Sequence, residues 1–429
     1  MYIMKEVRFD KYCRLCKYSD TNEADKPCCY CLETSYRECS QRPINYVESE
    51  RANYLTGMPA WKYKVKDYLY FLDYNELDYD YAYEYYKNNT PIVPMACSSL
   101  RNGQYYGRKL DWVYSNQAEF VVRTPKTSTA YATIGVAGGL SKLTEDFVAS
   151  NGTDELFKVV PFQLYDGMNE MGLTANINVV PTDHGENVSI PLSNKTDTLS
   201  ALQVIRYILD RFASAYTAAA YIRDHLEIHF PKQLHKMNYE LHYMIADMHN
   251  KTYCVEFVDN EAKIIDISKK PYMTNFHLYG VKFNDDGTVY TPETQDEDHN
   301  ASKTNLITDN GSGLERYNLI ARHYDEACTL NGMFDILNSL DYTRAYPSSD
   351  NPALHRWYTE FVGARNLTVA SPASDYEPVV SIADGYFRER TRQDGRTWHS
   401  MHSSIYDTYR GTLYLQTQED HSPTTFSIH

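Results

Sequence analysis

The residues with the clearest chemical spacing are cysteines near the start of the chain. Six of the nine cysteines precede residue 40, and four of these form two CxxC pairs separated by eleven residues: Cys13, Cys16, Cys28 and Cys31. Four thiolates at this spacing suit the tetrahedral sulfur shell of a structural zinc ion. We therefore predict a small zinc-binding module over residues 1–50, in which the metal offsets the shortage of buried apolar surface. The alternative is that these cysteines are unligated thiols.

A later cysteine, Cys97, lies in the stretch PMACSSLRNGQYYGRKLDW and indicates a different chemistry. A single cysteine is more often a small buried residue than a nucleophile. If cleavage after Ala96 exposed the α-amine of Cys97, however, that amine would have a pKa of about 7.7–8.0 and could accept the thiol proton without a histidine. This is the pattern of an activated N-terminal nucleophile. Asp111 would then orient the amine, and Arg108 would favour the thiolate.

Residues 51–96 separate the two cysteine regions and are rich in aromatic and acidic residues. Three interpretations are open: a linker, a strand lying on a neighbour, or a propeptide that masks a site until it is removed. Tyr79, Tyr81, Tyr83 and Tyr85 alternate with other residues, which predicts an extended conformation. The two prolines just before Cys97 mark the boundary of the next domain.

Short β-type runs and amphipathic stretches must position Cys97 and its neighbours. Runs bounded by Gly, Asn or Pro predict strands at Tyr105–Leu110, Glu119–Thr124, Tyr131–Val136, Phe162–Tyr165, Leu173–Val180, Tyr239–Asp247, Tyr253–Val258 and Ala262–Ile267. Apolar residues at three- and four-residue steps predict helices from Thr198 to Tyr216, capped by Asp197 or Thr198, and over Leu314–Asp325 and Met333–Leu340. Ser404–Tyr406 and Thr412–Gln416 predict a closing hairpin. Strands in blocks with helices between them predict a layered α+β fold.

Charge and hydropathy limit the partners of the chain. Lys and Arg total 42 and Asp and Glu total 57, which gives a net charge of −15. Such an acidic chain is unsuited to wrapping nucleic acid or docking on an anionic membrane. The sequence has no apolar stretch near the ~18 residues of a membrane span, and its start has no secretory signal. We expect a cytoplasmic protein whose cysteines are reduced or bind metal.

From Cys97 onwards the chain resembles the choloylglycine hydrolase family of N-terminal nucleophile hydrolases, which includes bile salt hydrolases and penicillin V acylases. The opening CSSLRNGQYYGRKLDW is similar to the family's Cys…GRNLDW stretch, and DGMNEMGLTANINVVP to its DG-NEKGL…N stretch. PYMTNFHLY resembles its TN segment, and SGLERYNLIARHY resembles its SRFVR helix. MFDILNSL and SSIYDTYRGTLYLQT are similar to its closing helix and hairpin. Six matches in the family's order cover residues 97–429.

The resemblance implies a four-layer αββα sandwich over residues 97–429 and a role for each matching residue. Cys97 would be the nucleophile, and after cleavage its amine the base; Arg108, Asp111 and Arg316 match other site residues of the family. Asn275 matches the oxyanion-hole asparagine of the TN pair. The second oxyanion asparagine is Asn178 or Asn176, and we prefer Asn178 because it lies just before the Val-Val-Pro sequence.

The implied reaction is hydrolysis of a linear amide through a thioester, without a cofactor. The substrate would be a small acyl amide such as a conjugated bile acid, a penicillin V-like compound or another N-acyl amide, and relatives are often homo-oligomers. Lys109 and Ser98 depart from the family pattern, and many relatives lose a much shorter leader than 96 residues. The alternatives are an unprocessed, inactive relative that binds a partner through its cysteine-rich module, and an enzyme that transfers the acyl group to an amine.

Overall fold

The computed structural model describes residues 57–66, 69–88, 96–112, 119–138, 155–181, 195, 197–229, 239–258, 261–289, 312–340, 376–379, 389–392, 399–417 and 422–429. The cysteine-rich segment 1–50, and with it the predicted zinc ligands Cys13, Cys16, Cys28 and Cys31, lies outside these residues. Among the helices described, none has the length and apolar character needed to traverse a bilayer.

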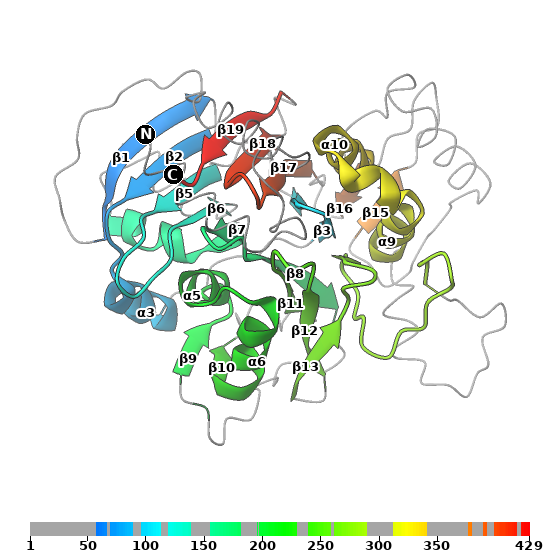
Figure 1. Cartoon of the computed structure of the whole chain (residues 1–429), viewed down its shortest axis with the longest axis horizontal. Helices are drawn as coiled ribbons and strands as arrows, with labels where there is room; N and C mark the ends of the chain where they lie inside the picture. The colour runs from blue at the N-terminus through cyan, green and yellow to red at the C-terminus, as the bar shows by residue number, and fades with distance from the viewer. Residues whose placement is uncertain are drawn as a thin grey trace, which may run out of the picture.

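The larger of two main sheets has nine strands (Figure 1). In spatial order these are β1 (Pro59–Lys66), β2 (Leu69–Tyr74), β5 (Glu119–Thr124), β6 (Thr133–Gly138), β7 (Leu164–Asn169), β8 (Thr174–Pro181), β11 (Tyr239–Ala246), β12 (Thr252–Val258) and β13 (Glu261–Asp266). β2 and β5 pair in parallel, and the other neighbours are antiparallel. The larger sheet is therefore mainly antiparallel, and β1 and β2 extend it at one edge.

The smaller main sheet carries Cys97. Its six antiparallel strands are, in spatial order, β14 (Tyr272–Met273), β3 (Ala96–Asn102), β4 (Tyr105–Trp112), β17 (His399–Asp407), β18 (Thr412–Thr417) and β19 (Thr424–Ser427). β3 and β4 form a hairpin that turns at Gly103, whose φ of +55° is a conformation glycine adopts readily. The hairpin pairs Cys97 with Leu110 and Ala96 with Asp111.

Helices cover the outer faces of the two main sheets. α5 (Val204–Arg211) and α6 (Ala215–His225) pack on β7, β8 and β12, and α9 (Ser312–His323) and α10 (Leu330–Ser339) pack on β3, β4 and β17. β3 also contacts β8, so the sheets face each other. The order is helix, sheet, sheet, helix (Figure 1). The prediction of a four-layer αββα fold is confirmed.

Two small sheets and three 3₁₀ turns complete the elements in the described part of the chain. β9 (Asp197–Ser200) pairs in parallel with β10 (Leu226–His229), and β15 (Tyr376–Val379) pairs with β16 (Glu389–Arg392). The turns are η1 (Glu155–Lys158), η2 (Val160–Phe162) and η4 (Tyr324–Cys328).

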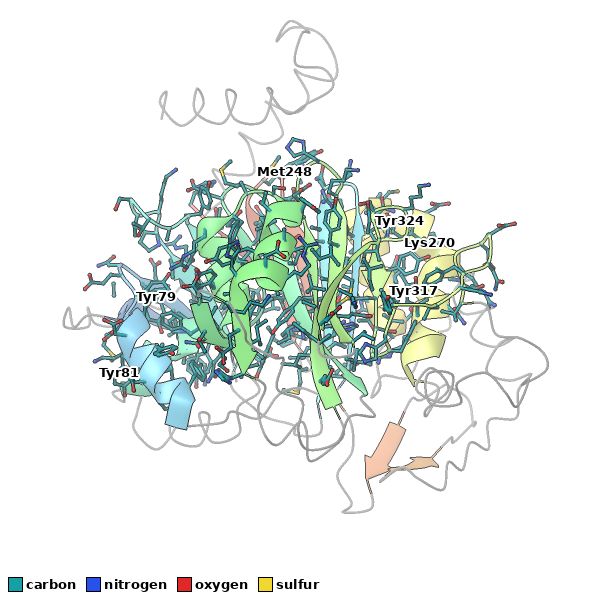
Figure 2. All side chains as sticks on the ribbon, turned by 90° about the horizontal axis from the view of Figure 1, so that it is seen from below. Tyr79, Tyr81, Met248, Lys270, Tyr317 and Tyr324 are labelled. Atoms are coloured by element: carbon teal, nitrogen blue, oxygen red, sulfur yellow. The ribbon has the colours of Figure 1, made fainter. Side chains whose placement is uncertain are left out.

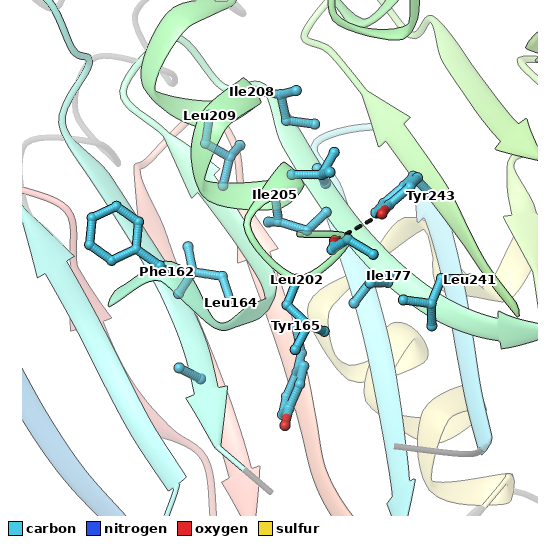
Figure 3. Packing of buried hydrophobic residues seen from close by; sticks show 14 of the residues in the cluster. Phe162, Leu164, Tyr165, Ile177, Leu202, Ile205, Ile208, Leu209, Leu241 and Tyr243 are labelled. Carbon is cyan, nitrogen blue, oxygen red and sulfur yellow. Dashed lines mark hydrogen bonds between the residues drawn. The ribbon is translucent and has the colours of Figure 1, made fainter. Parts of the chain in front are cut away.

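Strand alternation divides the side chains of β8 between an apolar core and the site. Ala175, Ile177 and Val179 are buried against the helix layer of α5 and α6, with Ile177 close to Ile205 and Tyr243 (Figure 3). Because successive side chains of a strand point to opposite faces, Asn176 and Asn178 face the smaller sheet, where both contact Ser99. The same strand therefore provides both core residues and predicted site residues.

The helix predicted from Thr198 begins later and is interrupted. Asp197–Ser200 forms β9, and the Asp197 carboxylate accepts a hydrogen bond from the hydroxyl of Tyr207 instead of capping a helix. α5 begins at Val204, and the extended backbone at Phe212, with φ −117° and ψ 147°, separates it from α6. Both helices bury an apolar face against the larger sheet. The apolar residues of the two helices therefore read as one continuous helical pattern in the sequence.

The alternating tyrosines near residue 80 lie on a helix, not on an extended segment. α3 (Tyr79–Asn88) buries Ala82 and Tyr86, four residues apart on one helical face. Asp78 precedes the helix, and its carboxylate accepts a hydrogen bond from the backbone N–H of Tyr81 at 3.0 Å, which favours a helix start. Tyr79 and Tyr81 lie on this helix at the opposite end of the molecule from Tyr317 and Tyr324 (Figure 2).

The described part of the segment 51–96 contributes the strands β1 and β2 to the larger sheet. β2 pairs along β5, and Leu69, Phe71 and Leu72 are buried in the core on the two faces of the larger sheet. Leu72→Ala is expected to lower the free energy of unfolding of the whole sandwich by about 2–5 kcal/mol because it leaves a cavity. Urea denaturation measures this effect.

The matched control for Leu72→Ala is Glu76→Ala, which changes an exposed residue just after β2. The free energy of unfolding of this variant should stay within about 0.5 kcal/mol of the wild type. An unfolding midpoint unchanged in Leu72→Ala would contradict the assignment of β2 to the sandwich core.

Candidate active site

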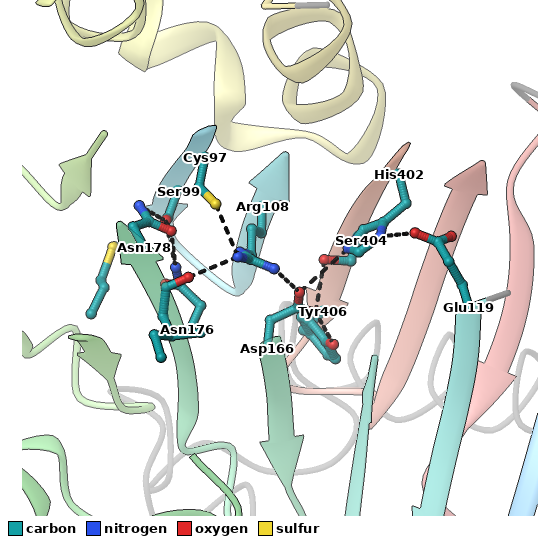
Figure 4. A network of polar contacts seen from close by, with 12 residues as sticks. Cys97, Ser99, Arg108, Glu119, Asp166, Asn176, Asn178, His402, Ser404 and Tyr406 are labelled. Carbon is teal, nitrogen blue, oxygen red and sulfur yellow. Dashed lines mark hydrogen bonds and ion pairs between the residues drawn. The ribbon is translucent and has the colours of Figure 1, made fainter. Parts of the chain in front are cut away.

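Cys97 is on β3 with its sulfur directed between the two main sheets (Figure 4). The residue is 1% exposed, and Nη2 of Arg108 lies 3.1 Å from Sγ. Arg108 is on β4 opposite Ser99, so it shares a sheet face with Ser99 and Cys97. Burial raises the pKa of the Cys97 thiol, and the positive charge of Arg108 opposes that rise. The guanidinium is therefore placed to stabilise a thiolate.

Asp166 on β7 holds Arg108 in this position. Nη1 of Arg108 donates to Oδ2 of Asp166 at 2.9 Å, and Nη2 donates to the carbonyl oxygen of Ile177 at 2.7 Å. Both side chains of the Arg108–Asp166 ion pair are fully buried. The guanidinium thus bridges the sheets and has one fixed orientation toward the sulfur.

Asp166 itself is surrounded by donors from β17. Ser404 Oγ donates to it at 3.0 Å, the Tyr406 hydroxyl also donates to it, and His402 Nε2 lies 3.5 Å away (Figure 4). Burial would raise the pKa of Asp166, but the hydrogen bond from His402 and the charge of Arg108 lower it to about 2. Burial alone would lower the pKa of His402, but the charges of Glu119 and Asp166 and their hydrogen bonds with its ring raise it to about 9. At neutral pH Asp166 and His402 are therefore both charged.

Asp111 and Arg316 meet on the outer face of the β3–β4 hairpin. Arg316, from α9, donates through Nη1 to Asp111 Oδ2 at 3.2 Å and to Ser98 Oγ at 2.9 Å. Asp111 also accepts a hydrogen bond from Ser400 Oγ at 2.6 Å, and both members of the ion pair are fully buried. Since the backbone of Asp111 pairs with Ala96, this ion pair lies next to the Ala96–Cys97 peptide bond.

Asn275 connects the ion pair to Cys97. It follows β14, and its Oδ1 accepts hydrogen bonds from the backbone N–H of Cys97 at 2.7 Å and from Arg316 Nη2 at 2.5 Å. Its Nδ2 donates to the carbonyl oxygen of Val179 at 2.6 Å. Five of the predicted site residues thus lie together around Cys97: Cys97 itself, Arg108, Asp111, Asn275 and Arg316.

The two alternative asparagines of β8 reach this group through Ser99. Asn178 Nδ2 lies 3.1 Å and Asn176 Nδ2 lies 2.8 Å from Ser99 Oγ, and Asn176 also donates to Asn178 Oδ1 at 2.7 Å. Asn178 Nδ2 is in addition 3.4 Å from the carbonyl oxygen of Thr274, next to Asn275. Among the described contacts, neither asparagine is hydrogen-bonded to Cys97. The preference for Asn178 stays a prediction.

The residues missed by sequence reasoning are those that position others. Asp166 begins the DGMNE stretch that carries part of the family resemblance, so its position was visible although no role was assigned to it. Ser99 lies two residues after Cys97 and therefore on the same strand face. The partners from β17 had no comparable signal, because Ser404 and Tyr406 are more than 200 residues away from Asp166 in sequence.

The segment of the chain that contains most of the candidate site residues is similar to a known protein family. Residues 96–297 match the sequence model of the "Linear amide C-N hydrolases, choloylglycine hydrolase family". No curated protein matches this chain by sequence. The segment includes Cys97, Arg108, Asp111, both asparagines of β8 and Asn275, and it ends before Arg316.

Several solved structures are similar to the chain. A variant of the conjugated bile acid hydrolase from Clostridium perfringens is 16% identical, with a TM-score of 0.44, and the match covers 78% of this chain and 92% of that chain. A second variant of that hydrolase is 15% identical, with the same coverage and TM-score. Penicillin V acylase from Agrobacterium tumefaciens is 16% identical, with a TM-score of 0.33, over 79% of this chain and 78% of that chain.

Proposed function

We propose that Cys97 is the nucleophile that cleaves the amide bond of a small N-acyl substrate, because residues 96–297 match the choloylglycine hydrolase family of linear amide C–N hydrolases. The observation that carries this proposal is the 3.1 Å contact between Arg108 Nη2 and Cys97 Sγ. A fixed, buried guanidinium beside a cysteine sulfur favours the thiolate, which is the reactive form.

In the proposed reaction the sulfur of Cys97 attacks the substrate carbonyl carbon. The thiol proton passes to the α-amine of Cys97, and that amine then protonates the departing nitrogen as the C–N bond breaks. The products of this half-reaction are a free amine and a thioester on Cys97. Water, deprotonated by the same α-amine, attacks the thioester and releases the carboxylic acid, which restores the thiol.

Asn178 and Asn275 are the proposed donors to the oxyanion formed during attack. In the uncleaved chain Asn275 Nδ2 donates to Val179 O, and Asn178 Nδ2 donates to Ser99 and lies near Thr274 O. An oxyanion would have to replace these acceptors. One such donor typically contributes about 3–4 kcal/mol to lowering the barrier.

The α-amine of Cys97 becomes available through cleavage of the Ala96–Cys97 bond. We infer that the sulfur attacks the Ala96 carbonyl, forming a thioester and freeing the amine, and that water then releases the Ala96 carboxylate and the thiol. The burial of Cys97 in the uncleaved chain fits a precursor whose nucleophile is protected from solvent. Because β2 pairs along β5, we expect the cleaved segment to stay bound to the sandwich.

Mass spectrometry of the purified protein tests this cleavage. Under denaturing conditions two fragments should appear, residues 1–96 and 97–429. Under native conditions a single species with the mass of both should remain, since β2 is buried in the sheet core. Amide hydrolysis by a preparation that contains only the full-length chain would contradict cleavage as the source of the catalytic amine.

A substrate panel with acid quenching tests the reaction itself. The panel consists of conjugated bile acids, phenoxyacetyl amides such as penicillin V, and N-acyl amides, and the peptide that begins at Cys97 is analysed for an added acyl group. We expect turnover of at least one class, with a transient acyl adduct on Cys97. Absence of both turnover and adduct across the panel would instead favour the inactive binding protein.

Three further predictions depend on the sequence alone. The cytoplasmic location, the zinc module at Cys13, Cys16, Cys28 and Cys31, and homo-oligomer formation follow from composition, spacing and family resemblance.

A further inference from the structure

A buried ion pair outside the proposed catalytic group lies on β11 and β12. Tyr243 pairs with Val255 in the antiparallel ladder, which brings His242 beside Glu256. His242 Nδ1 is 3.0 Å from Glu256 Oε1, and both side chains are fully buried. Burying an ion pair is costly unless its hydrogen bonds are satisfied, so the partners of this pair indicate what it is for.

Apart from contacts with Cys254, the remaining hydrogen bonds described for the pair go to one loop, residues 274–279. His242 Nε2 donates to the Thr274 carbonyl oxygen at 2.9 Å. The two carboxylate oxygens of Glu256 accept hydrogen bonds from the backbone N–H groups of Leu278 at 2.8 Å and Tyr279 at 3.0 Å. The pair therefore fixes the backbone both just before and just after Asn275.

The hydrogen bonds also show which groups donate to the loop and which accept from it. Since a carbonyl oxygen can only accept, Nε2 of His242 carries the hydrogen of its bond to Thr274. Burial would raise the pKa of Glu256, but hydrogen bonds from His242 and His277 keep it well below its ordinary value. Hydrogen bonds to an ionised carboxylate are stronger than hydrogen bonds between neutral groups.

We propose that His242 and Glu256 are positioning residues that hold Asn275 in contact with Cys97. Asn275 has to meet the Cys97 backbone nitrogen at 2.7 Å and Arg316 at 2.5 Å at the same time. It lies on a loop after a two-residue strand, so the ladder alone gives it little support. The tether supplies the missing support. This inference rests on the proposed function, because it assigns the pair to the reaction at Cys97.

The same cluster contains Cys254, whose sulfur is 3.6 Å from Glu256 Oε1 and 3.8 Å from His242 Nδ1. Three ligand types this close together also resemble a metal site. Cys254, however, has no contact with the 274–279 loop among the bonds of the described residues. The two assignments therefore predict opposite results for Cys254→Ala, which should be harmless for an ion pair and damaging for a metal site.

Kinetics of His242→Gln and Glu256→Gln test the positioning role. Each variant should lower kcat by roughly 10–100-fold, since a displacement of about 1 Å in a catalytic group costs on the order of 10²-fold. KM should change less than about threefold, and the double variant should be little worse than either single variant because the pair acts as one unit. Cys254→Ala and His323→Gln, which removes the peripheral His323–Glu326 contact, should keep wild-type kcat.

Hydrogen exchange at the backbone N–H groups of Leu278 and Tyr279 tests the tether without any turnover. Their exchange should become at least tenfold faster in Glu256→Gln and stay unchanged in Cys254→Ala. Unchanged exchange in Glu256→Gln overturns the tether, as does a loss of activity in Cys254→Ala accompanied by bound metal in the wild type. Faster exchange in Glu256→Gln combined with an inactive wild type overturns the proposed function and leaves the tether itself supported.

Discussion

Cys97→Ala is expected to lower amide hydrolysis by at least about 10⁴-fold, to the level of the assay background. The variant removes the proposed attacking atom, and removing the nucleophile can cost an enzyme as much as removing its whole catalytic group. Arg108 remains beside the site, but it can no longer stabilise a thiolate. The measurement is kcat/KM with the best substrate of the panel, and fragment analysis by mass spectrometry should also show an uncleaved chain.

The fold should survive this substitution. Cys97 is buried beside polar groups and belongs to an apolar cluster that includes Leu110, Tyr165 and Ile177, and cysteine and alanine differ by one sulfur atom. The midpoint of thermal unfolding should therefore move by a few degrees at most. The matched control is Cys328→Ser, which changes an exposed cysteine at the end of η4 and should keep full activity.

Cys97→Ser separates the nucleophile from the cleavage step. The hydroxyl can attack Ala96 or a substrate in the same geometry, but it is far less acidic than a thiol, so both steps should slow strongly. Cleaved but inactive Cys97→Ser would show that chain cleavage is less demanding than hydrolysis. Wild-type hydrolysis by Cys97→Ala would disprove the nucleophile assignment, because no sulfur would remain at the site.

Sequence patterns predicted many strands of the sandwich, because these strands have a distinct apolar run between turn residues, but they did not predict β1, β2, β3, β14 or β19. The run Glu119–Thr124 coincides with β5, and the closing hairpin lies within β17 and β18. The prediction of secondary structure was wrong where one stretch of sequence fits both the two-residue period of a strand and the helical period. The tyrosines of α3 alternate in sequence, yet Ala82 and Tyr86 are the residues that it buries.

The candidate site was predictable where residues follow one another along β3 and β4. Cys97, Arg108 and Asp111 lie on one hairpin, so their proximity follows from local pairing. The supporting groups come from β7, β17 and the strands that carry His242 and Glu256. Contacts between strands so distant in sequence are set by the stacking of the two sheets, which no local spacing encodes.

Asp166→Asn is expected to destabilise the sandwich by about 3–5 kcal/mol, because it leaves the buried guanidinium of Arg108 without its anion. The loss should also reduce kcat strongly, since the same guanidinium contacts Cys97 Sγ at 3.1 Å. Chemical denaturation and steady-state kinetics measure the two effects. Ser404→Ala, which removes one of several donors to Asp166, should cost less, about 1.5–3 kcal/mol.

The destabilisation caused by Asp166→Asn should depend on pH in a defined direction. The pKa of Asp166 is lowered from 3.8 to about 2 in the folded chain, so its contribution is present above about pH 4 and is lost as the pH falls toward 2. The difference between wild type and Asp166→Asn should shrink over that range. Asp73→Asn is the matched control, because the Asp73–Arg123 pair is 21% and 28% exposed and should contribute less than about 1 kcal/mol. Equal destabilisation by Asp166→Asn and Asp73→Asn would mean that the Arg108–Asp166 bridge does not hold the two sheets together.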